Sequence, residues 1–151
     1  MYVYNDYLIN SKICLYKHLI MSRPFHLAIP AGDLDIATSF YKNILGCKLG
    51  NREEGKWVDV DFWGNELTLH KTHTKLPKER HDVDMGSVSI PHFGAHLDKE
   101  VFEKIKTNLK KNNIKYFDEP YVRFKGKEEE QETFFLEDPH GNVLELKTFS
   151  K

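Results

Sequence analysis

The sequence has few of the features that mark specialised classes of protein. Its 151 residues include only two cysteines, Cys14 and Cys47, which excludes a disulfide-stabilised scaffold and favours the reducing cytoplasm. The 22 basic residues nearly balance the 23 acidic residues, so a net charge of −1 gives no electrostatic basis for binding nucleic acid or an anionic membrane. Uninterrupted apolar runs are far shorter than the roughly 18 residues of a membrane-spanning helix. We therefore expect a cytoplasmic protein that binds neither nucleic acid nor membrane.

The apolar residues that the chain does have are enough to build a buried core. They make up 40% of the chain, and aromatic residues make up 13%. The length fits one domain, or two small halves that share a core. Residues 1–21 are rich in tyrosine and differ in composition from the rest of the chain, so we expect an N-terminal extension outside the main fold.

The chain after this extension repeats one order of predicted elements. Residues 22–72 form the first unit, in which FHLAIP is strand-like and GDLDIATSFYKNILGC has helical spacing. Asp33 can cap the start of this helix, and Gly46 lies where a left-handed C-cap is needed. KWVDVDFW then alternates, Gly64-Asn65 predicts a hairpin, and ELTLHK is the returning strand.

The second unit, residues 89–151, has the same order. PHFGAHL is strand-like, Asp98 begins the helix DKEVFEKIKTNLKKNN, and the turn DPHGN joins the strands ETFFLED and VLELKTF. The intervening residues 73–88 are polar and aperiodic, which predicts an inter-module loop. The sequence thus predicts an α+β fold in which two βαβββ modules form a curved, cup-like mixed sheet with helices on the outside.

Potential metal ligands lie on equivalent strands of the two modules. His26 and His92 are near the start of the two first strands, 66 residues apart (92 − 26). Glu145 lies on the last strand, on the face opposite to Leu144 and Leu146. Two imidazoles and one carboxylate leave positions for water and substrate, and this set is typical of non-haem Fe(II) oxygenases.

The sequence leaves open which residue would be a fourth ligand. Glu145 is four residues after Gly141 (145 − 141), whereas His70 is six residues after Gly64 (70 − 64). Strict overlay of the two turns selects Thr68 instead. His70 and Thr68 have the same strand parity, so a shift of one pleat repeat decides between them.

These stretches resemble the vicinal oxygen chelate superfamily, which includes glyoxalase I, extradiol ring-cleavage dioxygenases, and fosfomycin and bleomycin resistance proteins. The sequence is most similar to a group of predicted extradiol-type dioxygenases. The resemblance is carried by PFHLAIPAGDLDIATSFYKNILGCKLG, WVDVDFWGNELTLH, PHFGAHL and, most strongly, FFLEDPHGNVLEL. It implies that His26, His92 and Glu145 bind the metal, and that His70 matches the extra position used by glyoxalase-like members.

The resemblance also implies a function. A three-ligand site favours Fe(II) and an extradiol-type dioxygenase that acts on a small, catechol-like substrate. With four ligands, Ni(II), Zn(II) or Mn(II) and a glyoxalase-like lyase or isomerase are the alternative. A third alternative is a resistance or binding protein that sequesters a ligand. The superfamily pairs its modules within one chain or across a dimer, and we expect a homodimer.

Further residues near the predicted ligands are candidates for other roles. His96 shares the face of His92, and His96 and Tyr121 are the candidates for a general acid or base. Arg123 can bind an anionic group through two hydrogen bonds. The candidates for substrate binding are Arg123, Phe124, Gln131 and Trp57. A packing or surface role is the alternative for each, and we expect His73, His81 and His140 on the surface.

Overall fold

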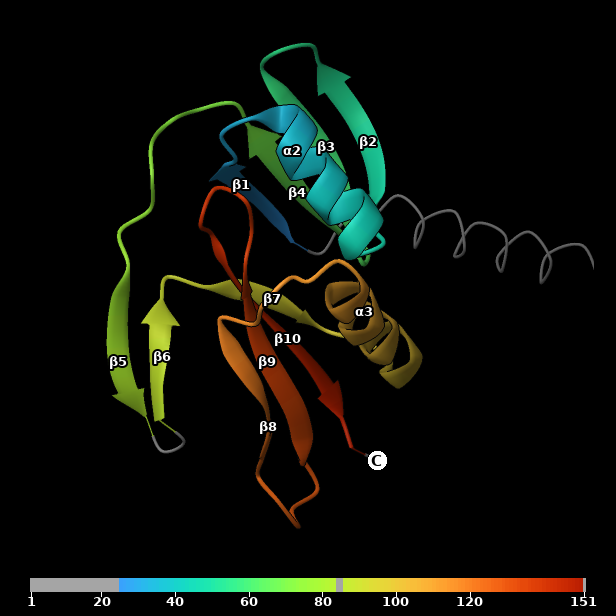
Figure 1. The fold of residues 1–151 in the computed structure, drawn as a ribbon, viewed down its shortest axis with the longest axis vertical. Coiled ribbons are helices and arrows are strands. Elements are labelled where there is room, and N and C mark those ends of the chain that lie inside the picture. Colours follow the sequence, from blue (N-terminus) through green and yellow to red (C-terminus); the bar gives the residue numbers. More distant parts are fainter. Residues whose placement is uncertain (1–24, 84–85, 151) are drawn as a thin grey trace, which may run out of the picture.

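The computed structural model describes residues 25–83 and 86–150 (Figure 1). The predicted extension, residues 1–21, lies outside the described residues. The described part contains two four-stranded sheets, each with its own helix, and a separate two-stranded sheet. This arrangement confirms the predicted α+β fold of two repeated modules. No helix in the two described segments combines the length and apolar character needed to cross a membrane.

The first module is a mixed sheet with a short helix. Its elements are β1 (His26–Pro30), α2 (Leu34–Ser39), the π-helical turn η1 (Phe40–Ile44), β2 (Lys48–Glu53), β3 (Trp57–Phe62) and β4 (Asn65–His70). The strand order is β1-β4-β3-β2, and β1 runs parallel to β4. Asp33 caps α2 as predicted, because its carboxylate accepts hydrogen bonds from the backbone N–H groups of Asp35 and Ile36 at 3.0 Å.

The second module repeats this topology. Its elements are β7 (Phe93–His96), α3 (Lys99–Lys111), β8 (Asp118–Arg123), β9 (Gln131–Glu137) and β10 (Val143–Phe149). The strand order is β7-β10-β9-β8, with β7 parallel to β10. The apolar residues of α3 at helical spacing, Phe102, Ile105 and Leu109, are buried. Asp98 precedes α3, but its side chain makes no capping hydrogen bond.

The segment between the modules contains an antiparallel hairpin. Its strands are β5 (Glu79–Val83) and β6 (Gly86–Ile90). The expectation of a loop over residues 73–88 was therefore wrong for much of that stretch. All side chains of β5 are exposed, so β5 has no buried face that would give an alternating pattern in the sequence. The guanidinium of Arg80 attaches the hairpin to the second module through Asp118 at 3.0 and 3.2 Å.

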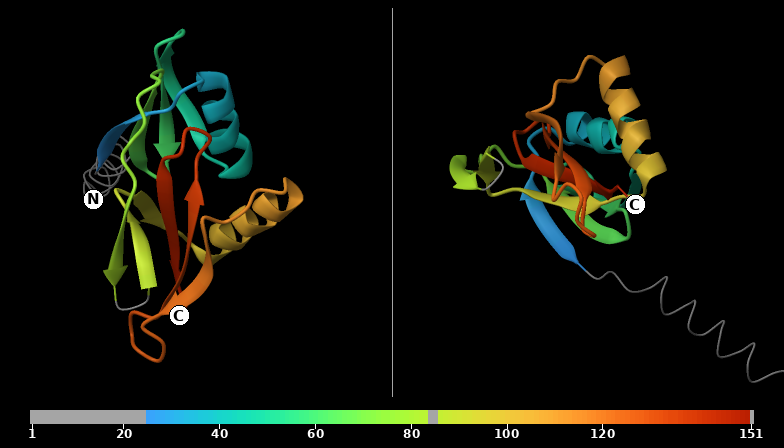
Figure 2. Two further views of the ribbon diagram at one scale, coloured as in Figure 1. Left: turned by 60° about the vertical axis from the view of Figure 1, so that its left-hand side comes forward. Right: turned by 90° about the horizontal axis from the view of Figure 1, so that it is seen from below.

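One hydrophobic core joins the two modules through their helices. Figure 2 shows α2 and α3 on the same side of the two sheets. Buried residues of η1, such as Phe40 and Ile44, belong to the same apolar cluster as Phe102 of α3. The Asn108 side-chain amide also donates to the carbonyl of Ile44 at 3.0 Å. The helices therefore cover the core faces, and the opposite face of each sheet carries the polar side chains.

The β9–β10 turn fixes the second module against the first. The Tyr41 hydroxyl is buried and donates to Asp138 Oδ2 at 3.1 Å. Asn142 Nδ2 donates to the carbonyl of Pro30 at 2.8 Å. Burial, followed by the charge of Asp138, raises the pKa of Tyr41 well above its usual value. The turn therefore joins the modules through a buried polar network.

His140, in the same turn, is half-buried, in contrast to the surface position expected from the sequence. Its Nε2 lies 2.7 Å from the carbonyl oxygen of Thr74. Its ring packs so closely on Gly32 that a Cβ there would lie 2.6 Å from Nδ1. Gly32 also has a φ of +63°, so both the close approach and the backbone require glycine.

Candidate functional site

The register of β7 on β10 gathers polar side chains on the non-core face of the second sheet. Glu145 pairs with Gly94, and Lys147 pairs with His96. Side chains alternate along a strand, so residues 92, 94 and 96 share one face with residues 145 and 147. The predicted ligands His92 and Glu145 therefore lie together, on a face that also carries His96 and Lys147.

His92 and Glu145 form the central pair of this site. His92 Nε2 lies 3.3 Å from Glu145 Oε2. His92 Nδ1 lies 2.6 Å from the carbonyl oxygen of Ser89, which can only accept a hydrogen bond, so Nδ1 carries the proton. In the neutral imidazole, Nε2 then turns its lone pair toward the carboxylate oxygen. Two lone pairs that face each other suit a cation between them. In metal-binding histidines, the ring nitrogen that does not bind the metal usually donates to a carbonyl or carboxylate, which fixes the tautomer.

The carboxylate of Glu145 is held firmly although it is buried. Only 7% of its side chain is exposed. Oε1 accepts a hydrogen bond from Thr133 Oγ1 at 3.1 Å, and Oε2 lies 2.9 Å from Lys147 Nζ. These donors compensate the loss of hydration that burial of a carboxylate causes.

Gly94 makes the close contact between β7 and β10 possible. A Cβ at this position would lie 1.6 Å from the carbonyl oxygen of Glu145. Any side chain would therefore separate the strands. Since His92 precedes Gly94 by two residues and Glu145 pairs with it, this glycine sets the distance between the two candidate ligands.

A cavity of about 440 Å³ opens over this pair. It is lined by Trp63, Asn65, His92, Phe93, Gly94, Ala95, His96, Glu145 and Lys147. An adjoining hollow of about 460 Å³ shares Asn65, His92, Phe93 and Gly94 with it and extends to Phe25, Leu27 and Glu66 of the first module. The site therefore lies where β7 meets the first module, and its wall combines aromatic rings with a few polar groups.

The first module carries a second pair of an imidazole and a carboxylate. His26 Nδ1 lies 2.7 Å from Glu66 Oε1, across the parallel pairing of β1 and β4. The side chains are 56% and 41% exposed. Glu66 was not among the residues predicted from the sequence. It lies two residues after Gly64, and only the parallel register of two distant strands places it opposite His26.

The strand pairing shows which of Thr68 and His70, the two positions considered for a fourth ligand, is equivalent to Glu145. Thr68 pairs with Ala28 on β1, as Glu145 pairs with Gly94 on β7. Thr68 is therefore the structural counterpart of Glu145. His70 lies two residues farther along β4 and is exposed.

One chain brings together only part of the predicted ligand set. In residues 25–83 and 86–150, no three His, Cys, Asp or Glu side chains converge so as to hold one metal ion. His92 is paired with Glu145, and His26 is paired with Glu66. Imidazole and carboxylate are ligands of divalent transition metals, so the chemistry of each pair fits such an ion. Each pair supplies two potential donor groups.

His96, predicted as a candidate acid or base, lines the same cavity. Its ring stacks on Phe149 with centroids 4.9 Å apart. Burial, followed by the positive charge of Lys147, lowers the pKa of His96 below its ordinary value. This shift favours the neutral imidazole.

The other predicted residues do not line this cavity. Tyr121 and Arg123 are on β8, and Arg123 pairs in register with Gln131 of β9. The Arg123 guanidinium lies 5.0 Å from the centre of the Phe124 ring. Trp57 belongs to the first module and lies outside the cavity lining. His96 therefore lines the cavity over the pair, whereas these five residues are not part of its lining.

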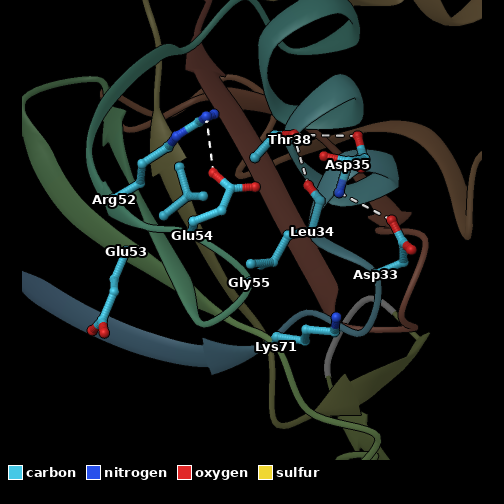
Figure 3. Close-up of a pocket in the computed structure, with 10 residues that line it drawn as sticks. Asp33, Leu34, Asp35, Thr38, Arg52, Glu53, Glu54, Gly55 and Lys71 are labelled. Atoms are coloured by element: carbon cyan, nitrogen blue, oxygen red, sulfur yellow. Dashed lines mark hydrogen bonds and ion pairs between the residues drawn. The ribbon is translucent and has the colours of Figure 1, made fainter.

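A separate, smaller hollow of about 130 Å³ lies on the helix side of the first sheet (Figure 3). The start of α2 and the β2–β3 turn form its wall. Figure 3 shows Arg52 turned toward Glu54, and their charged groups are 3.0 Å apart. Its lining contains no imidazole, and both side chains of this ion pair are exposed.

Comparison with known proteins agrees with this architecture. The family model of the Glyoxalase/Bleomycin resistance protein/Dioxygenase superfamily matches residues 23–146. A glyoxalase/bleomycin resistance protein/dioxygenase from Alicyclobacillus acidocaldarius is 38% identical in sequence, with a TM-score of 0.67. That match covers 87% of this chain and 94% of the other. No curated protein matches the chain significantly.

More distant structures share the fold. The fosfomycin resistance protein FosX from Listeria monocytogenes is 15% identical with a TM-score of 0.63, covering 86% of this chain and 95% of its own. A lactoylglutathione lyase from Agrobacterium tumefaciens is 18% identical with a TM-score of 0.58, covering 84% and 93%. Proteins with different activities therefore share this arrangement of modules, and the fold alone does not select among them.

Proposed function

Because the chain belongs to the glyoxalase/bleomycin resistance protein/dioxygenase superfamily, we propose that it is a metal-dependent enzyme, an Fe(II) dioxygenase of the extradiol type. Members of this superfamily act on small molecules and are often dimers. The observation that carries the proposal is the buried carboxylate of Glu145 facing His92 Nε2 at 3.3 Å, with the tautomer fixed by Ser89. Completing this pair with one further imidazole gives the two-histidine, one-carboxylate set of Fe(II) oxygenases.

The third ligand in this proposal is His26 of a second copy of the chain. His26 is 56% exposed and lies on the non-core face of the first sheet. The two modules of one chain are joined through their helices, so these faces are available to a partner. A symmetric dimer would then bring His26 of each copy to His92 and Glu145 of the other, forming two equivalent sites.

The residues of the cavity have defined tasks in such a reaction. The bound metal would orient two vicinal oxygens of a catechol-like substrate and stabilise negative charge on them. His96 lines the cavity, and its lowered pKa favours the neutral imidazole, which can accept a proton from a substrate hydroxyl. Trp63 and Phe93 provide an apolar wall for a ring. Tyr121 and Arg123 lie farther along the face and would contact a longer substrate.

A glyoxalase-like lyase is the second candidate, and Glu66 is the observation that favours it. Glu66 Oε1 lies 2.7 Å from His26 Nδ1. If Glu66 accompanies His26 to the metal, the site has two imidazoles and two carboxylates. Four protein ligands suit Ni(II) or Zn(II) and an isomerisation in which a carboxylate moves the proton.

The two functions are separated by paired activity assays and one variant. We expect O2 uptake with a panel of catechols under Fe(II), and no turnover of methylglyoxal with glutathione under Ni(II). Glu66→Gln should weaken metal binding by about 10- to 100-fold if Glu66 only orients His26, and by much more than about a hundredfold if it is itself a ligand. His92→Ala should abolish binding in both cases. Absence of tight metal binding by the wild-type dimer would contradict both, and binding of an organic ligand without metal would favour sequestration.

A further inference from the structure

Lys147 is a charged group of this cavity that the proposed function leaves without a role. Its Nζ lies 2.9 Å from Glu145 Oε2, the same atom that His92 Nε2 faces at 3.3 Å. Glu145 and Lys147 are two residues apart on β10, so their side chains leave the same face. Only 21% of the Lys147 side chain is exposed. The ammonium group therefore occupies space beside the carboxylate oxygen that a metal would use.

An ammonium group and a divalent ion at the same carboxylate oxygen repel each other. In a half-buried site this repulsion is weakly screened, because water and salt have limited access. Lysine carries its charge at the end of a flexible four-carbon stem, so the charge can move while the backbone stays in place. The cavity of about 440 Å³ beside Lys147, with Asn65 and His96 in its wall, has room for the displaced group.

We propose that Lys147 is a tethered cation that neutralises Glu145 in the metal-free protein and, when a divalent ion displaces it, binds an anionic oxygen of the substrate. The inference rests on the proposed function and adds a negative charge to its catechol-like substrate. Lys147 is the lysine or arginine side chain that lines this cavity. Trp63 and Phe93 complete the cavity with aromatic surface. The substrate class is therefore a small aromatic anion, such as a catecholate or an aromatic carboxylate.

The first test measures metal affinity alone. Lys147→Met removes the competing charge and keeps a similar side-chain volume. Lys106→Met is the matched control, because Lys106 is 25% exposed and lies 2.8 Å from Glu132, outside the cavity. Calorimetric titration of chelator-treated protein with Co(II) should give at least about tenfold tighter binding for Lys147→Met. Lys106→Met should bind Co(II) like the wild type.

The second test measures the binding of an anionic aromatic ligand. 4-Nitrocatechol, whose visible absorption reports its ionisation and binding, is titrated into Co(II)-loaded protein. Loss of a charge-assisted contact should weaken its binding about tenfold in Lys147→Met, although this variant holds the metal more tightly. If Lys147 had only a structural role, its replacement would weaken the binding of Co(II) and the binding of 4-nitrocatechol together. If Lys147→Met does not fold, as judged by circular dichroism, Lys147→Gln takes its place in both titrations.

The outcomes separate this inference from the proposed function. If the wild type binds Co(II) but the uncharged variants bind it equally or more weakly, the role of Lys147 is overturned and the metal site stands. Unchanged 4-nitrocatechol affinity overturns the assigned substrate class. If the wild-type dimer does not bind Co(II), both the proposed function and the role of Lys147 fall.

Discussion

The two modules carry the same pair of residue types in different surroundings. His92 and Glu145 are 27% and 7% exposed, and the Glu145 carboxylate has contacts from Thr133 and Lys147 as well. His26 and Glu66 are 56% and 41% exposed. The pair in the second module is thus held rigidly in its chain, whereas the pair in the first module lies open on the non-core face.

This difference indicates how a site can be divided between two copies of a chain. The buried pair is arranged before any ligand binds, so little reorganisation is needed there. The exposed pair remains accessible to the surface of a partner. Removing a buried, fully bonded group should therefore affect the fold, whereas removing an exposed group should affect only assembly and metal binding.

The largest loss of stability is expected from a substitution in β7, the first strand of the second module, compared with the equivalent position in β1, the first strand of the first module. Gly94→Ala places a Cβ 1.6 Å from the Glu145 carbonyl oxygen and must move β7, which should cost about 3 kcal/mol of unfolding free energy or more. Its counterpart Ala28→Gly removes a Cβ at the equivalent register and should cost only about 0.5–1 kcal/mol. Urea unfolding of both variants measures the difference. Equal losses would show that the strand contact in the second module is not special.

The second largest loss of stability is expected when Glu145 is replaced, and it is compared with the loss when Glu66 is replaced. Glu145→Gln leaves the largely buried ammonium of Lys147 without its negative partner, and should cost about 2–3 kcal/mol. Glu66→Gln removes a carboxylate from an exposed pair and should change stability by less than about 0.5 kcal/mol. The two variants are compared by urea unfolding of metal-free protein. A loss from Glu66→Gln as large as that from Glu145→Gln would contradict the contrast between the pairs.

A moderate effect is expected where the modules join. Tyr41→Phe removes the hydrogen bond to Asp138 and should cost about 1.5 kcal/mol at pH 7. Because the pKa of folded Tyr41 is raised, its contribution is present below the unfolded value of 10.0 and declines as the pH rises above it. The stability difference between wild type and variant should therefore shrink above that pH. A difference that stays constant between pH 8 and about 11 would contradict a buried, neutral phenol.

The smallest effect is expected at the hairpin. Arg80 and Asp118 are 41% and 28% exposed, so their ion pair is partly screened by solvent. Arg80→Met should cost about 0.5 kcal/mol, although it also removes the contact of the guanidinium with Phe117. Hydrogen exchange should show faster exchange confined to β5 and β6. Faster exchange throughout the second module would mean that the hairpin supports the sheet.

The sequence predicted those parts of the fold that depend on local patterns. The Asp33 cap, the DPHGN turn and the alternation around Glu145 are read over a few residues, and the structure confirms that Asp33 caps α2 and that Leu144 and Leu146 are buried. Asp98, by contrast, makes no capping hydrogen bond. The hairpin escaped prediction because all side chains of β5 are exposed, so this strand has no buried face that would give an alternating pattern. The change from α-helix to π-helix after Ser39 likewise had no signal that we recognised.

The candidate site was predictable only in part. Strand parity placed His92, His96 and Glu145 on one face, and the structure brings all three to one cavity. The pairing of His26 with Glu66 depends on the parallel register of strands that are distant in sequence, which no local pattern reveals. Lys147 was within reach of prediction, since it is two residues from Glu145 and so leaves the same face.

The most direct test of the central claim mixes two defective chains. His26→Ala and His92→Ala are each expected to abolish tight Co(II) binding in their own homodimers. If the ligands come from two copies, a mixed dimer of these variants contains one intact site and should bind about one ion per dimer. If each site lies within a single chain, both chains of the mixed dimer are defective, and absence of tight binding by the mixed dimer would contradict the account.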